Sequence, residues 1–130
     1  MIGIDTNVLV RYLAQDDPVQ SARATKFIER LSAHDPGFIS VVTMVETAWV
    51  LDRAYGLTAG EVATAIERVH QADVLVVENE PEVFASMVML KEARGSFADA
   101  LIGGLGAAAG CSHTVSFDRK ATRIPGFRTL

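Results

Sequence analysis

The sequence contains very little cysteine, and its few soft metal ligands are scattered along the chain. Cys111 is the only cysteine among 130 residues, so no disulfide can form within the chain. The three histidines are not spaced as zinc ligands, either with one another or with Cys111. These absences exclude a disulfide-stabilised fold and a structural zinc site, and they fit a reducing compartment.

Long apolar runs and a targeting segment are also missing. No run approaches the ~18 apolar residues that a membrane-spanning helix needs. The N-terminal segment MIGIDTNVLV has no basic region, and Asp5 interrupts its apolar stretch, unlike a secretory signal peptide. We therefore expect a cytoplasmic protein without a membrane partner.

The chain is also short of positive charge. Its net charge is −4, so bulk attraction to nucleic acid is not expected. The bases are unevenly placed, however. The last twelve residues, RKATRIPGFRTL, contain four bases and no acid, and they begin directly after Asp118.

Length and composition predict a single domain over residues 1–130, because 49% of the residues are hydrophobic and the length suits one core. Strands are expected at 1–5, 38–39, 74–77 and 113–116, with a weaker one near Arg128. Helices are expected at 7–14, 16–31, 41–55, 58–71, from Pro81, and 96–110.

This alternation predicts an α/β fold with a mainly parallel sheet of four to five strands and helices on both faces. Sites in such folds form beyond the carboxyl ends of the strands. Asp5 and Asp118 both follow expected strands. Each also has a structural interpretation: Asp5 as the N-cap of the next helix, and Asp118 as a turn residue. Ser116 is placed to bond the Asp118 carboxylate, a metal-bound water or a phosphate.

Two more acids fall in apolar helices. Glu46 lies in VVTMVETAWVL, which predicts burial, so its carboxylate must be paired, protonated or bound to metal. The alternative is a buried salt bridge to Arg11 or Arg53. Asp99 follows Ser96 in S-x-x-D, which is a capping pattern that is compatible with a charged site.

The four acids are far apart in sequence, and only the fold could gather them. Carboxylates packed together would repel one another strongly, and a divalent cation would remove that penalty. Mg²⁺ or Mn²⁺ prefers oxygen ligands and activates water against phosphodiesters. Such chemistry needs no side-chain nucleophile. No Ser-His-Asp or Cys-His arrangement is evident in this sequence.

Two features invite other interpretations. GGLGAAAG (103–110) resembles a glycine-rich nucleotide loop, but it lies within an expected helix and does not follow a strand. Small residues that allow close packing are the better interpretation. Trp49 lies at helical spacing from Val42 and Val45, which favours the core or a subunit interface.

The segments IDTNVL, VETAWVL, FADALI and SFDRKA resemble, in that order, the four acidic motifs of PIN domains. The match spans nearly the whole chain and is most similar to the VapC toxins of type II toxin–antitoxin pairs. The resemblance implies a three-layer PIN-like sandwich. It assigns metal binding and catalysis to Asp5, Glu46, Asp99 and Asp118, with Asn7 and Ser116 in support.

The resemblance also implies an activity and partners. The activity would be Mg²⁺- or Mn²⁺-dependent cleavage of RNA by water, leaving a 5′-phosphate. The partners would be a second copy of the chain and a small antitoxin. Two alternatives remain: a catalytically silent PIN-like module that binds RNA or protein, and a phosphatase or receiver-like domain that uses Asp5.

Overall fold

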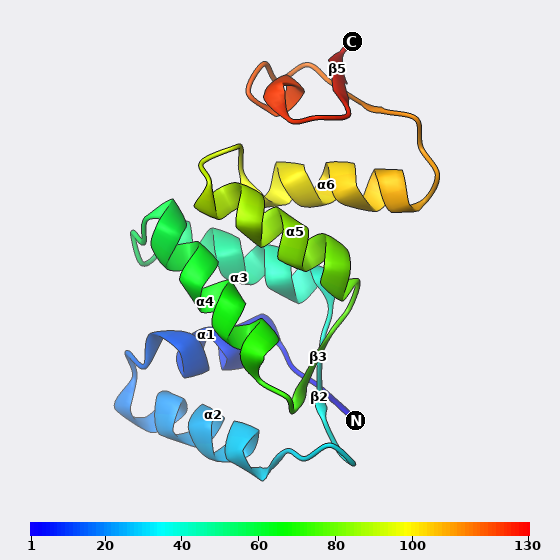
Figure 1. Cartoon of the computed structure of the whole chain (residues 1–130). Coiled ribbons are helices and arrows are strands. Elements are labelled where there is room, and N and C mark those ends of the chain that lie inside the picture. The colour runs from blue at the N-terminus through cyan, green and yellow to red at the C-terminus, as the bar shows by residue number, and fades with distance from the viewer. The chain divides into compact units, whose positions relative to one another are not determined.

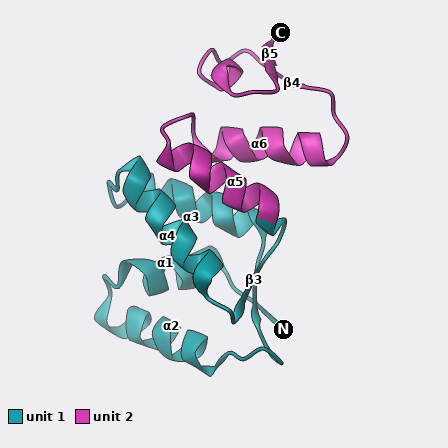
Figure 2. Cartoon of the chain, in the orientation of Figure 1, with its two compact units in different colours: residues 1–80 teal, residues 81–130 magenta.

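The computed structural model describes all residues, 1–130, and the chain divides into two compact units. Unit 1 is Met1–Glu80 and unit 2 is Pro81–Leu130 (Figure 2). Together they contain six α-helices and five strands, and every strand pair is parallel. The predicted α/β class is therefore confirmed.

Unit 1 holds three of the strands and four of the helices. Its strands pair in the order β1-β2-β3, with Ile2 opposite Gly37 and Phe38 opposite Val76. The elements are β1 (Ile2–Gly3), α1 (Thr6–Ala14), α2 (Pro18–Arg30), β2 (Gly37–Ile39), α3 (Val41–Arg53), α4 (Ala59–Gln71) and β3 (Leu75–Val77).

Local capping sets the helix starts in unit 1. Asp17 accepts from the backbone of Val19 and Gln20, just before Pro18 opens α2. Ser40 caps α3, as the sequence predicts. Thr58 and Glu61 bond one another's backbone N–H, which completes the predicted capping box of α4.

The core of unit 1 forms where these helices meet the sheet. Helix α1 packs against α2 and α3, and α3 packs against α4 (Figure 1). Side chains from α1, β2, α3 and α4 have at most 1% of their surface exposed: Leu9, Ile39, Met44, Leu51 and Ile66. Burying such a side chain contributes about 1.5–3 kcal/mol. This core holds the amino end of α1 against the middle of α3.

Unit 2 is a smaller α/β arrangement. It contains α6 (Phe97–Ala108), β4 (Thr114–Ser116), a short 3₁₀ helix η1 (Ala121–Arg123) and β5 (Phe127–Thr129), and α5 (Glu80–Lys91) begins at the boundary. Strands β4 and β5 pair in parallel, which confirms the weakly marked last strand. The five strands are parallel as expected, but they form two sheets, β1-β2-β3 and β4-β5, where the sequence predicted one sheet of four to five strands.

The glycine-rich segment is helical, as expected. A Cβ on Gly103 would lie 2.5 Å from the Phe127 ring, and one on Gly106 would lie 3.2 Å from the Thr114 hydroxyl. These glycines allow α6 to approach the residues of β4 and β5 closely. The packing interpretation of GGLGAAAG is confirmed, and the segment is not a phosphate loop.

Candidate functional site

Asp5 lies between the end of β1 and the start of α1. It is the N-cap of α1, and its Oδ1 accepts a hydrogen bond from the backbone N–H of Thr6 at 2.8 Å. The side chain is exposed, and capping occupies only one of its two carboxylate oxygens. The structural role predicted for Asp5 is therefore present, and it leaves a carboxylate oxygen available for a ligand.

Glu46 is exposed, so the predicted burial of this carboxylate is wrong. Helix α3 buries one face, which carries Thr43, Met44, Thr47, Ala48 and Leu51. Glu46 lies on the opposite side, where Val42 and Trp49 are 67% and 61% exposed. The run of apolar residues had suggested that every face of α3 is buried, but only one face is covered. Of the two positions predicted for Trp49, the core is therefore wrong, and the subunit interface stays a prediction.

Glu46 also has a different partner from those expected. Its Oε1 accepts a hydrogen bond from the hydroxyl of Thr6 at 3.0 Å. Neither predicted salt bridge forms, because Arg11 pairs with Asp16 at 3.0 Å and the nearest acid to Arg53 is Asp52. The Thr6 hydroxyl therefore ties the Glu46 carboxylate to the residue that follows Asp5.

Asp5 and Glu46 open onto one hollow of unit 1, which has a volume of about 450 Å³. Thr6 and Asn7 also line it, so its rim carries carboxylate, hydroxyl and amide oxygens. Hard divalent cations such as Mg²⁺ and Mn²⁺ prefer these donors. The chemistry of this donor set therefore fits the kind of ion that the sequence predicts, and Asp5 and Glu46 are its two carboxylates.

Arg11 and Tyr55 also line this hollow, and they form a polar cluster with Asp16. Tyr55 donates a hydrogen bond to Asp16 at 2.7 Å, and Arg11 donates to Tyr55 at 2.9 Å. The Tyr55 hydrogen bond lowers the pKa of Asp16, and the Asp16 carboxylate raises the pKa of Tyr55. The cluster joins α1 to the end of α3 and holds the Arg11 guanidinium against Asp16.

Asp99 lies in the first turn of α6 in unit 2. Its backbone N–H donates to the Ser96 hydroxyl at 3.0 Å, so Ser96 is the predicted N-cap. Asp99 is half-buried, and as an acid in the first turn it is favoured by the helix dipole. The helix start thus places a carboxylate where a negative charge is stabilised.

Asp118 and Ser116 interact differently from the way the sequence suggested. The Ser116 hydroxyl accepts from the backbone N–H of Asp118 at 3.0 Å, so it contacts the backbone of Asp118 where a bond to the carboxylate had been considered. That carboxylate instead accepts from the backbone N–H of Lys120 at 2.8 Å. Asp118 is exposed and shapes the turn after β4, which is the structural role that the sequence allowed.

Each unit therefore carries two of the four acids, Asp5 and Glu46 in one and Asp99 and Asp118 in the other. Neither unit by itself gathers three or more acidic, histidine or cysteine side chains that could hold a metal ion. Within unit 1, the linked pair of Asp5 and Glu46 is the candidate site.

Sequence reasoning missed Thr6 and Tyr55. Thr6 lies in Asp5-Thr6-Asn7, where all three residues resemble helix caps, and nothing local indicates that its hydroxyl reaches α3. Tyr55 lies 39 residues from its acceptor, Asp16. Only packing of the helices brings such partners together.

Comparison with known proteins decides the family. The PIN domain family model matches residues 2–126, which is nearly the whole chain and covers both units. The chain belongs to the PIN domain family. A search of curated proteins found no significant match.

Membership places the site in a chemical context. PIN domains are usually metal-dependent nucleases that bind divalent ions, and the oxygen donors around Asp5 and Glu46 suit such ions. No helix of this PIN domain is long and apolar enough to cross a membrane.

Proposed function

We propose that this PIN domain is an endoribonuclease that uses Mg²⁺ or Mn²⁺. The observation that carries the proposal is the coupling of Asp5 to Glu46 through Thr6 at one hollow of oxygen donors. The family match over residues 2–126 supports the nuclease class. It also supports a single PIN-like domain over residues 1–130.

The likeness to the acidic motifs of PIN domains assigns the roles of the residues. Asp5 and Asp99 would be the core metal ligands, and Glu46 and Asp118 would hold ions directly or through water. Asn7 and Ser116 support them. A divalent ion held by these acids would offset their mutual repulsion and would supply an activated water for attack on the phosphodiester, which would leave a 5′-phosphate. Thr6 orients Glu46 so that its second oxygen remains free.

RNA is the proposed substrate because the sequence resembles the VapC group of PIN domains, and an exposed basic segment offers contacts for its phosphates. Arg119, Lys120, Arg123 and Arg128 are all exposed, and they lie just after Asp118. Phosphate contacts from such residues supply affinity independently of sequence. They offset the overall charge of −4 at the place where the substrate is expected.

We further propose that the chain is the VapC-type toxin of a toxin–antitoxin pair, acts as a homodimer, and is silenced by a small antitoxin. The exposed apolar side chains Val42 and Trp49 on α3 support contact with a second copy. Analytical ultracentrifugation tests this contact. Trp49→Ser should shift the chain toward monomer, whereas an unchanged dimer would place the interface elsewhere.

The nuclease proposal is tested by incubating structured and unstructured RNA with Mn²⁺, with and without EDTA. Wild type should cleave only with metal, and Asp5→Asn should not cleave although it keeps a good helix cap. Products should carry a 5′-phosphate and accept ligation without kinase treatment. Equal activity in EDTA or in Asp5→Asn would indicate a contaminating nuclease and contradict the proposal.

A catalytically silent PIN module is the second candidate. Its support is that Asp5 and Asp118 both bond backbone N–H groups, and that neither unit gathers three acids. The exposure of Glu46 removes the argument that a buried glutamate requires a metal. RNA binding without cleavage in Mg²⁺ and Mn²⁺ would favour this module over the ribonuclease.

A further inference from the structure

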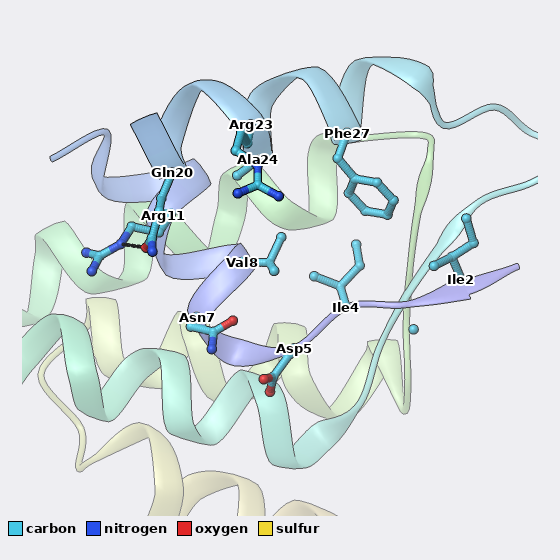
Figure 3. Close-up of a pocket in the computed structure, with 11 residues that line it drawn as sticks. Ile2, Ile4, Asp5, Asn7, Val8, Arg11, Gln20, Arg23, Ala24 and Phe27 are labelled. Carbon is cyan, nitrogen blue, oxygen red and sulfur yellow. Dashed lines mark hydrogen bonds between the residues drawn. The ribbon is translucent and has the colours of Figure 1, made fainter. Parts of the chain in front are cut away.

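A second hollow of unit 1, with a volume of about 720 Å³, lies beside the start of α1. Its lining comes from β1, α1 and α2 (Figure 3). Asp5 and Asn7 line this hollow as well as the metal-binding one. The two hollows therefore meet at the residues proposed to hold and support the ion.

The second hollow is lined by two arginines, and only one of them already has partners in the chain. The guanidinium of Arg11 is engaged by Asp16 and by Gln20, which accepts from Nε at 2.8 Å. Arg23 is exposed and makes no hydrogen bond or ion pair with the rest of the chain. The hollow thus presents one uncommitted guanidinium, which suits a phosphate group.

An aromatic side chain lines the same hollow one helical turn further along α2. Arg23 and Phe27 both project from α2 toward Val8 and Ile4 (Figure 3). Phe27 is half-buried, so part of its ring faces the hollow. A cation beside an aromatic face and apolar side chains is the combination that binds a phosphate together with a stacked base.

The direction of the Asp5 carboxylate decides whether Arg23 can pair with it. Its carboxylate points away from α2, and so away from Arg23 (Figure 3). Arg23 is therefore not a partner of the proposed metal ligand. A group held by Arg23 would be next to the site of cleavage and not at it.

We infer that this hollow binds one nucleotide of single-stranded RNA flanking the scissile phosphate, with Arg23 on a phosphate and Phe27 stacked on the base. The inference rests on the ribonuclease proposed above and adds a substrate subsite to it. The volume lies within the ~300–1,000 Å³ that is usual for small-ligand sites. Because every base has an aromatic face, the subsite tolerates any base.

The test measures binding of a fluorescein-labelled single-stranded RNA octamer by fluorescence anisotropy, in EDTA so that no cleavage occurs. Arg23→Ala should weaken binding, and the slope of log K against log salt should fall by about 0.7 because one phosphate contact is lost. Arg23→Lys should restore the slope. Arg30→Ala is the matched control, since Arg30 is an exposed arginine of α2 that does not line the hollow.

Stacking is tested with Phe27→Leu, which keeps an apolar side chain, and with octamers that carry one abasic nucleotide. Phe27→Leu should weaken binding of intact RNA by about 5- to 150-fold. At one position along the RNA, the abasic substitution should make wild type and Phe27→Leu bind alike. Thermal unfolding of each variant separates loss of fold from loss of stacking.

The outcomes distinguish this inference from the ribonuclease proposal. If wild type cleaves RNA in Mn²⁺ but Arg23→Ala and Phe27→Leu bind as wild type does, the nucleotide subsite is refuted and cleavage stands. That result would also direct attention to a protein occupant of the hollow. If binding depends on Arg23 and Phe27 but no RNA is cleaved, the subsite is supported and the nuclease assignment is refuted.

Discussion

The hydroxyl of Thr6 donates a hydrogen bond to Oε1 of Glu46 across 3.0 Å, although the two residues are 40 positions apart. Thr6 is the first residue of α1 and Glu46 lies in the middle of α3. The backbone N–H of Thr6 donates to the Asp5 carboxylate. One threonine therefore holds two candidate metal ligands, one through its backbone and the other through its side chain.

Replacing Thr6 by valine should uncouple Glu46 while keeping the shape of the side chain. A hydrogen bond of this kind contributes about 1 kcal/mol, so Thr6→Val should raise the Mn²⁺ concentration for half-maximal cleavage about fivefold. Thr6→Ser keeps the hydroxyl and is the control. The same metal requirement in all three proteins would show that this hydrogen bond does not orient Glu46 for metal binding.

Two substitutions of Asp5 should separate its structural role from its chemical one. Asn caps helices as well as Asp does, so Asp5→Asn should unfold in urea at nearly the wild-type midpoint. Asp5→Ala loses the cap and should cost about 1 kcal/mol of stability. Both variants should lose RNA cleavage. Cleavage by Asp5→Asn at the wild-type rate would leave Asp5 with capping alone.

Metal should stabilise the folded protein. Mn²⁺ at ten times its dissociation constant should add about 1.4 kcal/mol, because the ion binds only the native site, and Tm should rise by a few degrees. Differential scanning fluorimetry with added Mn²⁺ and then EDTA measures the shift and its reversal. Asp5→Asn and Glu46→Gln should show little shift. Shifts as large as that of wild type would place the ion elsewhere.

Acid should weaken the cluster of Arg11, Asp16 and Tyr55. The hydrogen bond from Tyr55 lowers the pKa of Asp16 below its usual 3.8. The stabilisation by Asp16 is therefore complete above that usual value and is lost as pH falls through the lowered one. Urea unfolding from pH 6 to pH 2 should show a smaller loss in Tyr55→Phe than in wild type. If the free energy of unfolding fell equally with pH in both proteins, the Tyr55 hydrogen bond would not contribute to the acid sensitivity.

The helix starts could be predicted because their causes are local. Ser40 bonds the backbone of Thr43, Thr58 bonds that of Glu61, and Ser96 bonds that of Asp99. The two partners of each contact are only three positions apart, so a short sequence motif contains both of them. The order of helices and strands, and the family likeness at the four acids, follow from similarly short motifs.

The surroundings of Glu46 could not be predicted in this way. Its apolar neighbours in α3 suggested burial, but Val42 and Trp49 lie on the uncovered face. Which face of an apolar helix is covered depends on the elements that pack against it, and these come from distant parts of the chain. Glu46 bonds Thr6 and not Arg11 or Arg53 for the same reason, because the packing of distant elements decides which side chain reaches it.

By itself, the sequence determined the α/β class and the helix starts at Ser40, Thr58 and Ser96, because periodicity and capping act over a few residues. Only the tertiary structure decided that Glu46 is exposed and bonded to Thr6. Only it set an uncommitted Arg23 beside Phe27 in a hollow next to Asp5. These relationships depend on how α1, α2 and α3 pack, which no short segment encodes alone.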